Sequence, residues 1–189
     1  KGIAHILASL ASLGTALAAF KPFSDFDHIR LVGRALSTLF DLGTVLLAYF
    51  IGAKVWDRRV GLLGAAFVGF AVLHIQLAHF YAFDTILTFL TMASVLLALR
   101  LMPKPTLRGS LLLGVVLGLA LATKISSLPI LTVLAGAHGL RLFLAEKKDG
   151  SGLSVRMPTA GKINRAIGLS ALSVATAVMV LVILQPYTI

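Results

Sequence analysis

The sequence predicts an all-α protein, a polytopic bundle of helices that crosses a membrane. Of its 189 residues, 58% are hydrophobic and only 13% are charged, and the mean hydropathy is +0.98. A soluble domain of this length does not bury so much apolar surface. The apolar runs are about twenty residues long and lack the alternation of β-strands, so helices are the expected spanning elements.

Turn-forming and charged residues divide the apolar sequence into separate runs. Pro22 breaks the chain within 21–30, and the stretches WDRR, HFYAF, MPKPTLRG and TKISS separate the later runs. We expect five to six spans in a single transmembrane domain, and the candidate segments are 31–55, 60–78, 84–101, 107–122, 127–143 and 167–184. Residues 1–20 are apolar but rich in Ala, Ser and Gly, so they either span the membrane or form an interfacial helix.

Most of the basic residues are expected on one side of the membrane. The chain has 17 Lys and Arg against 7 Asp and Glu, a formal net charge of +10. These bases lie in short loops between apolar runs, which indicates membrane topology rather than nucleic-acid binding. Twelve of the 17 belong to one set of loops and helix ends: Lys54, Arg58, Arg59, Arg100, Lys104, Arg108, Arg141, Lys147, Lys148, Arg156, Lys162 and Arg165. The positive-inside rule makes this side cytoplasmic, together with the long hydrophilic loop 145–166.

Four charged residues are expected within or at the ends of the spans, where each charge needs a physical reason. Arg34 and Asp41 are seven residues apart and share one helix face. They either form a buried polar seam that fixes helix packing, or Arg34 binds an anionic headgroup near the external surface. Asp84 either caps the helix that it opens or serves an external cavity as a base, metal ligand or orienting group. Lys124 either suits the C-terminus of its helix or supplies a point charge for phosphate.

Other polar and small residues favour structural roles. His74 and His79 are five residues apart, a poor spacing for sharing one metal ion on a helix. The sequence has no cysteine, which excludes disulfides and thiolate metal sites within it. Gly114 and Gly118 form a GxxxG motif, which we expect to pack closely against another helix.

Several stretches, taken in order, resemble one family. They are HIRLVGRALSTLFDLGTVLLAYFIGAKVWDRR, the HFYAFD that begins the next span, GLALATKISSLP and the terminal QPYTI. Together they resemble the glycosyltransferase-C superfamily, in its protein O-mannosyltransferase and aminoarabinose transferase branch. The resemblance covers residues 28–130 best, and it rests on the order and topology of the motifs rather than on any one of them.

The resemblance implies a membrane glycosyltransferase of the bacterial cell membrane. Such an enzyme moves a sugar from a polyprenyl-phosphate donor to an acceptor at the external face. Asp84 is similar to the family's second acidic position, which implies a catalytic role in orienting the acceptor or, in members that use Mg²⁺ or Mn²⁺, in binding the metal ion. Arg34 and Lys124 are implied as phosphate partners, and His79 and Tyr81 as further substrate-binding residues. A carboxylate can activate a hydroxyl, and fixed cations stabilise a leaving phosphate.

The family's principal acidic position lies in its first external loop, and the SDFD of residues 24–27 does not match it. We therefore expect these 189 residues to be part of a longer chain, with that acid upstream and residues 1–20 as a helix of the loop. The alternative is a non-catalytic membrane subunit that packs against neighbouring subunits of a larger complex; an acidic pair upstream would favour the enzyme. A transporter needs a continuous polar path, whereas here the polar groups gather at the external end.

Overall fold

The computed structural model describes residues 26–79, 82–102, 105–135 and 160–186, and this part of the chain is helical throughout. The elements are α3 (Phe26–Val55), α4 (Arg58–Gly69), α5 (Val72–His79), α6 (Phe83–Leu101), α7 (Leu107–Thr123), the 3₁₀ helix η1 (Ile125–Leu131), α8 (Thr132–Ala135) and α10 (Ala160–Leu184). The predicted all-α fold is confirmed. The predicted segment 1–20 and most of the predicted loop 145–166 lie outside the described residues.

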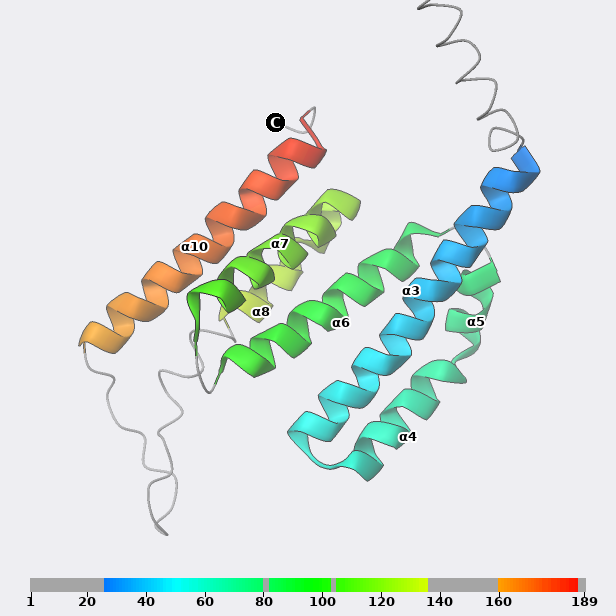
Figure 1. Cartoon of the computed structure of the whole chain (residues 1–189), viewed down its shortest axis with the longest axis horizontal. Coiled ribbons are helices and arrows are strands. Elements are labelled where there is room, and N and C mark those ends of the chain that lie inside the picture. Colours follow the sequence, from blue (N-terminus) through cyan, green and yellow to red (C-terminus); the bar gives the residue numbers. More distant parts are fainter. Residues whose placement is uncertain (1–25, 80–81, 103–104, 136–159, 187–189) are drawn as a thin grey trace, which may run out of the picture.

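The long helices run side by side and alternate in direction (Figure 1). α4 packs on α3, α3 on α6, α6 on α7 and α7 on α10. Short turns join α3 to α4 and α6 to α7, whereas the other two pairs are distant in the sequence. Three helices are long and apolar enough to cross a membrane, over Arg30–Val55, Phe83–Leu101 and Ile163–Leu184, and α7 is a shorter apolar helix. Large apolar side chains such as Phe67 and Phe70 remain 78% and 81% exposed on the bundle surface, as is suitable for side chains that face lipid.

The structure places a break where the sequence predicts one continuous span over residues 60–78. α4 ends at Gly69, and the backbone of Phe70 has φ −93° and ψ 0°, outside the helical range. The amide of Ala71 donates to the carbonyl of Val68 at 3.2 Å, a tight turn from which α5 starts again. Neither α4 nor α5 alone reaches the length of about twenty residues needed to span the hydrocarbon core.

The later boundaries also differ from the predicted ones. The predicted span 127–143 begins within a 3₁₀ helix, which covers residues 125–131. Pro129 lies inside it and lacks the N–H that an α-helix requires. Residues 136–143 of that span lie outside the described part of the chain. α10 begins at Ala160, so the predicted loop 145–166 ends in helix rather than in coil.

The best-packed seam of the bundle joins α7 to its two neighbours. Leu113, Leu117 and Ala120 of α7 are fully buried. On the α10 side, a Cβ added to Gly114 would lie 2.5 Å from the carbonyl oxygen of Ser173, and one added to Gly118 would lie 2.7 Å from that of Ala177. These distances confirm that the GxxxG motif is a close helix-packing device.

Polar groups also bind α7 to α10 across this seam. The Ser173 hydroxyl donates to the carbonyl of Ser110 at 2.9 Å in a fully buried position. Near the other end, the side-chain amide Nε2 of Gln185 donates to the carbonyl of Ala122 at 2.5 Å. The seam therefore fixes the C-terminal end of α7, where the predicted site residue Lys124 follows.

Candidate functional site

One end of the bundle gathers the start of α6 and the end of α7. α6 begins at Phe83 after the N-cap residue Ala82, whose backbone is extended, with φ −110° and ψ 128°. α7 ends at Thr123, and Lys124, with φ −157° and ψ 114°, turns the chain into η1. Because α6 and α7 are antiparallel neighbours, the first turn of one lies beside the last turn of the other (Figure 1).

Asp84 and Lys124 form an ion pair across this junction. Lys124 Nζ lies 3.3 Å from Asp84 Oδ1, although the two residues are 40 positions apart in the sequence. Both side chains are 56% exposed, so the pair is open to a ligand. Such an exposed pair contributes about 1 kcal/mol or less to folding. Two of the residues predicted to act together are therefore brought within hydrogen-bond distance.

The capping interpretation of Asp84 is wrong. The N-cap residue of α6 is Ala82, which makes no side-chain cap hydrogen bond, and Asp84 lies within the first helical turn. The Thr85 hydroxyl donates to the carbonyl of Ala82 at 2.8 Å, so it does not cap the free amides of this turn either. The Asp84 carboxylate is thus free of backbone capping and points outward toward α7, while the helix N-terminus still favours its negative charge.

A groove adjoins the ion pair. Leu87 and Thr91 follow Asp84 by three and seven positions, so all three share one face of α6. An open hollow of about 380 Å³ lies on this face. Its wall combines hydroxyl and apolar side chains from α6, η1 and α8: Leu87, Thr91, Ser126, Ser127, Pro129, Ile130, Thr132 and Val133. Asp84 and Lys124 do not line this groove, but they lie three and two positions before its lining residues Leu87 and Ser126.

The geometry of η1 places its two serines beside Lys124. The amide of Ser127 donates to the Lys124 carbonyl at 2.9 Å, and its hydroxyl donates to the carbonyl of Ala120 at 3.2 Å. The Ala120 carbonyl also accepts from the Lys124 amide at 3.2 Å, so the second bond ties η1 to the last turn of α7. These contacts fix the direction in which the chain leaves α7, and hence the start of the Lys124 side chain.

The other predicted site residues are not joined to this pair. The guanidinium of Arg34 is half-buried on α3 and makes no hydrogen bond or ion pair with any described residue, although the carbonyl of Arg34 accepts from Thr38 at 2.9 Å. For His79 only the backbone is described, as the last residue of α5. Tyr81 lies outside the described residues.

The described residues do not by themselves build a metal site. No group of three or more His, Cys, Asp or Glu side chains is gathered among them. At the junction of α6 and α7, Asp84 supplies one carboxylate, and the Lys124 ammonium lies against it. The expectation of Mg²⁺ or Mn²⁺ at Asp84 stays a prediction, and no step of the reaction below depends on it.

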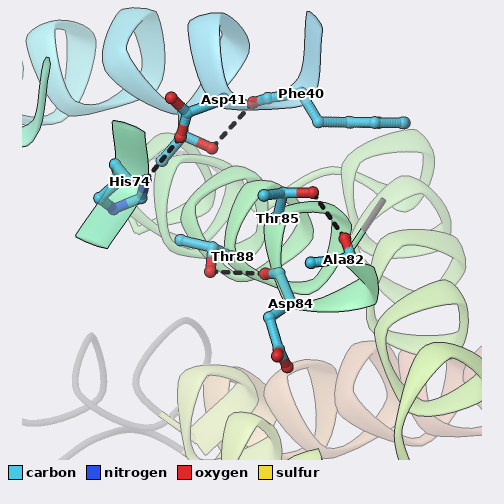
Figure 2. Close-up of polar contacts among 8 residues, drawn as sticks. Phe40, Asp41, His74, Ala82, Asp84, Thr85 and Thr88 are labelled. Carbon is cyan, nitrogen blue, oxygen red and sulfur yellow. Dashed lines mark hydrogen bonds and ion pairs between the residues drawn. The ribbon is translucent and has the colours of Figure 1, made fainter. Parts of the chain in front are cut away.

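A second polar pair lies on the other side of α6, and the sequence did not predict it. His74 Nδ1 of α5 lies 2.6 Å from Asp41 Oδ1 of α3, and the two side chains are 22% and 16% exposed. Figure 2 shows these two side chains facing each other, whereas Asp84 points away from them. The signal available in the sequence was that a carboxylate and an imidazole both lie at membrane depth, where each needs a partner.

The seam interpretation of the Asp41 face agrees with the structure. Ser37 and Thr44, which extend that face of α3, are 0% and 1% exposed. The Thr44 hydroxyl donates to the carbonyl of Phe40 at 2.9 Å. Asp41 is therefore part of a polar face of α3 turned into the bundle, and its partner is His74.

The fold and the site together define an integral membrane protein, a helix bundle with an open ion pair and a groove at one end. A family model described as dolichyl-phosphate-mannose-protein mannosyltransferase matches residues 8–160. The chain belongs to this family, whose members are membrane glycosyltransferases of the mannosyltransferase type. Searches of curated proteins and of solved structures gave no match.

Proposed function

We propose that this protein transfers a sugar from a polyprenyl-phosphate donor to an acceptor hydroxyl, with Asp84 as the catalytic carboxylate and Lys124 as the phosphate-binding cation. The observation that carries the proposal is the exposed Asp84–Lys124 pair, held between two helix ends beside a groove. The family supplies the class of reaction. In this proposal Asp84 accepts the proton of the acceptor hydroxyl, and Lys124 stabilises the negative charge on the leaving phosphate.

The proposed reaction is a displacement at the anomeric carbon of the sugar. The acceptor oxygen forms a bond to this carbon, and the bond from the carbon to the phosphate oxygen breaks. The proton of the acceptor hydroxyl passes to the Asp84 carboxylate, which acts as general base. The electron pair of the broken bond stays on the phosphate, so polyprenyl phosphate leaves with an added negative charge. Lys124 Nζ stabilises this charge as a positioned cation.

Lys124 can bind the phosphate of the donor with hydrogens that Asp84 does not use. The Lys124 ammonium has three donors, and only one distance of 3.3 Å joins it to Asp84. A phosphate that enters beside Lys124 gains a charge-assisted hydrogen bond and leaves the Asp84 carboxylate available to the acceptor. The apolar wall formed by residues such as Leu87, Ile130 and Val133 suits the first part of the polyprenyl chain. Arg34, which has no charged partner among the described residues, is proposed as a second phosphate contact.

The proposed location is the external face of a bacterial plasma membrane. Lys54 at the end of α3, Arg58 and Arg59 at the start of α4, Arg100 at the end of α6 and Arg108 at the start of α7 share the end opposite to Asp84. The positive-inside rule makes that end cytoplasmic, together with the loop 145–166. The Asp84–Lys124 end then faces outward.

The test replaces Asp84 by Asn, which keeps the size and removes the negative charge. The protein from its complete reading frame would be assayed for transfer of radiolabelled mannose from polyprenyl-phosphate mannose into membrane proteins. We expect the rate to fall by about a hundredfold or more, within the range that general acid–base catalysis contributes. Thermal unfolding in detergent should be nearly unchanged, because the pair is exposed.

Asp57→Asn is the matched control for this substitution. Asp57 caps α4 at the other end of the bundle, where its carboxylate accepts from the amide of Val60 at 2.8 Å. Asn caps helices as well as Asp does, so this variant should transfer at the wild-type rate. Wild-type turnover by folded Asp84→Asn would remove Asp84 from the mechanism. A folded wild-type protein that transfers no sugar would favour the non-catalytic subunit instead.

A further inference from the structure

We infer that Asp41 and His74 form a positioning pair that holds α5 against α3 and thereby sets the place of Asp84. This inference rests on the proposed role of Asp84. The pair contacts neither Asp84 nor Lys124, and it acts through α5, which packs on both α3 and α6.

Few apolar side chains of α5 pack against its neighbours. It has only eight residues and is cut off from α4 by the break at Phe70. Val72, Leu73 and Ile75 are 68%, 65% and 46% exposed, so they do not bury α5 in the bundle. Its position must therefore depend on a small number of specific contacts.

The Asp41–His74 contact is short and mostly shielded from solvent. A distance of 2.6 Å between Nδ1 and Oδ1 requires a proton between the two atoms, held either by the imidazole or by the carboxyl group. Both side chains are mostly buried, so loss of one partner leaves the other polar group without a hydrogen bond at membrane depth. The pair thus joins α5 to the middle of the long helix α3.

α5 comes directly before α6, the helix that carries Asp84. α5 ends at His79, and only a short connection precedes Ala82, the N-cap residue of α6. The Ala82 carbonyl accepts from both the amide and the hydroxyl of Thr85, at 3.4 and 2.8 Å, so the start of α6 is held on this residue. A shift of α5 pulls on Ala82 and therefore on the turn that carries Asp84. Figure 2 shows the Thr85 side chain directed toward the carbonyl of Ala82 at the start of α6.

Loss of the Asp41–His74 pair should lower turnover rather than weaken donor binding. Asp84 must lie within hydrogen-bond distance of the acceptor hydroxyl when the bond forms. Displacement of a reacting group by about 1 Å can lower a rate by about a hundredfold. Lys124 is held by α7 and η1, which the Asp41–His74 pair does not contact, so phosphate binding should persist.

The experiment compares His74→Ala with His74→Asn in the full-length protein, with polyprenyl-phosphate mannose as donor. The amide nitrogen of Asn occupies the place of Nδ1 and can still donate to Asp41. We expect His74→Ala to lower kcat by about tenfold or more, to change the donor KM by less than about twofold, and His74→Asn to restore most of kcat. Asp41→Ala should match His74→Ala, and the double variant should be no worse than either, because both remove one interaction. Gln76→Ala, an exposed position on α5, should behave as wild type.

A readout that does not depend on activity accompanies these rates. The sequence has no cysteine, so Ala82→Cys introduces the only thiol within these residues. Its rate of reaction with a maleimide should rise severalfold when His74 is replaced by Ala and return toward the wild-type rate with Asn. If His74→Ala does not fold, His74→Leu, which fills more of the space, takes its place.

The outcomes separate this inference from the proposed function. Wild-type kcat in His74→Ala, or a maleimide rate at position 82 that does not respond to it, would overturn the positioning role. Equal losses in folded Ala and Asn variants would show that the hydrogen bond is not what matters, which also overturns it. Full activity of Asp84→Asn would refute the proposed function, whereas an inactive Asp84→Asn with a fully active His74→Ala would refute only the inference.

Discussion

Asp84 and Lys124 each lie where a helix end favours their charge. A carboxylate in the first turn of α6 interacts favourably with the helix dipole, and so does an ammonium just after the last turn of α7. These favourable interactions with the helix ends are compatible with the proposed functional roles of the two residues. The antiparallel packing of α6 and α7 brings Lys124 Nζ to 3.3 Å from Asp84 Oδ1, a contact that the sequence alone did not predict.

Lys124→Ala should weaken the interaction with the donor. We expect the KM for polyprenyl-phosphate mannose to rise by about tenfold, or about 1.4 kcal/mol of binding free energy. Lys124→Arg should restore part of this loss, because Arg keeps the charge but places it differently. Steady-state rates over a range of donor concentrations measure both variants.

The control for this prediction is Lys54→Ala. Lys54 also lies at the end of a helix, α3, but at the opposite end of the bundle. It should leave the donor KM unchanged. A donor KM that is the same for wild type and Lys124→Ala would exclude Lys124 as the phosphate contact.

At the scale of elements, sequence patterns predicted where helices lie better than where they break. The apolar runs of α3, α6, α7 and α10 are long and continuous, and each was predicted as a helix. The break at Phe70 has no proline, and its local sequence, VGFAV, carries only Gly69 as a signal. Pro129 gave a clearer signal, but the length of the 3₁₀ helix around it depends on contacts such as the bond of Ser127 to Ala120.

The contact of α7 with α10 makes a stability prediction. Gly114→Ala places a methyl group 2.5 Å from a backbone oxygen of α10, where no flexible side chain can yield. We expect a loss of about 1–3 kcal/mol in the free energy of unfolding, typical of overpacked sites. Thermal unfolding followed by size-exclusion chromatography in detergent would detect it.

Gly168→Ala on α10 is the matched control. No atom lies within 4 Å of the Cβ that this change adds. Ala favours a helix over Gly by about 0.5–1 kcal/mol, so this variant should be as stable as wild type or slightly more stable. Equal effects of the two substitutions would contradict the close packing of α7 on α10.

At the scale of the whole molecule, charge and apolar length predicted the class of protein, while the partners of single residues came only from the structure. Asp41 and His74 are 33 positions apart on different helices, and no spacing rule joins them. Asp84 and Lys124 were predicted for one site, but the resemblance suggested it rather than any periodicity. Arg34 was predicted for the same site and remains apart from the pair among the described residues.

The two ends of the bundle differ in character. Five basic residues of the described helix ends lie at one end of the bundle: Lys54, Arg58, Arg59, Arg100 and Arg108. The Asp84–Lys124 pair lies at the other end, near the groove. A sugar carrier in the membrane would reach the groove from the lipid, with its phosphate at the level of the helix ends. We propose that the Asp84–Lys124 end faces outward and binds the phosphate of this carrier.

The most direct test is the reaction of a single cysteine, Ser126→Cys, with a membrane-impermeant maleimide on intact cells. Ser126 is exposed in the wall of the groove and lies two positions after Lys124. We predict that this thiol reacts from outside, that added polyprenyl phosphate slows the reaction, and that Ser151→Cys in the loop 145–166 reacts only after the cells are permeabilised. A Ser126→Cys thiol that reacts only after permeabilisation, or at a rate that polyprenyl phosphate does not change, would contradict the account.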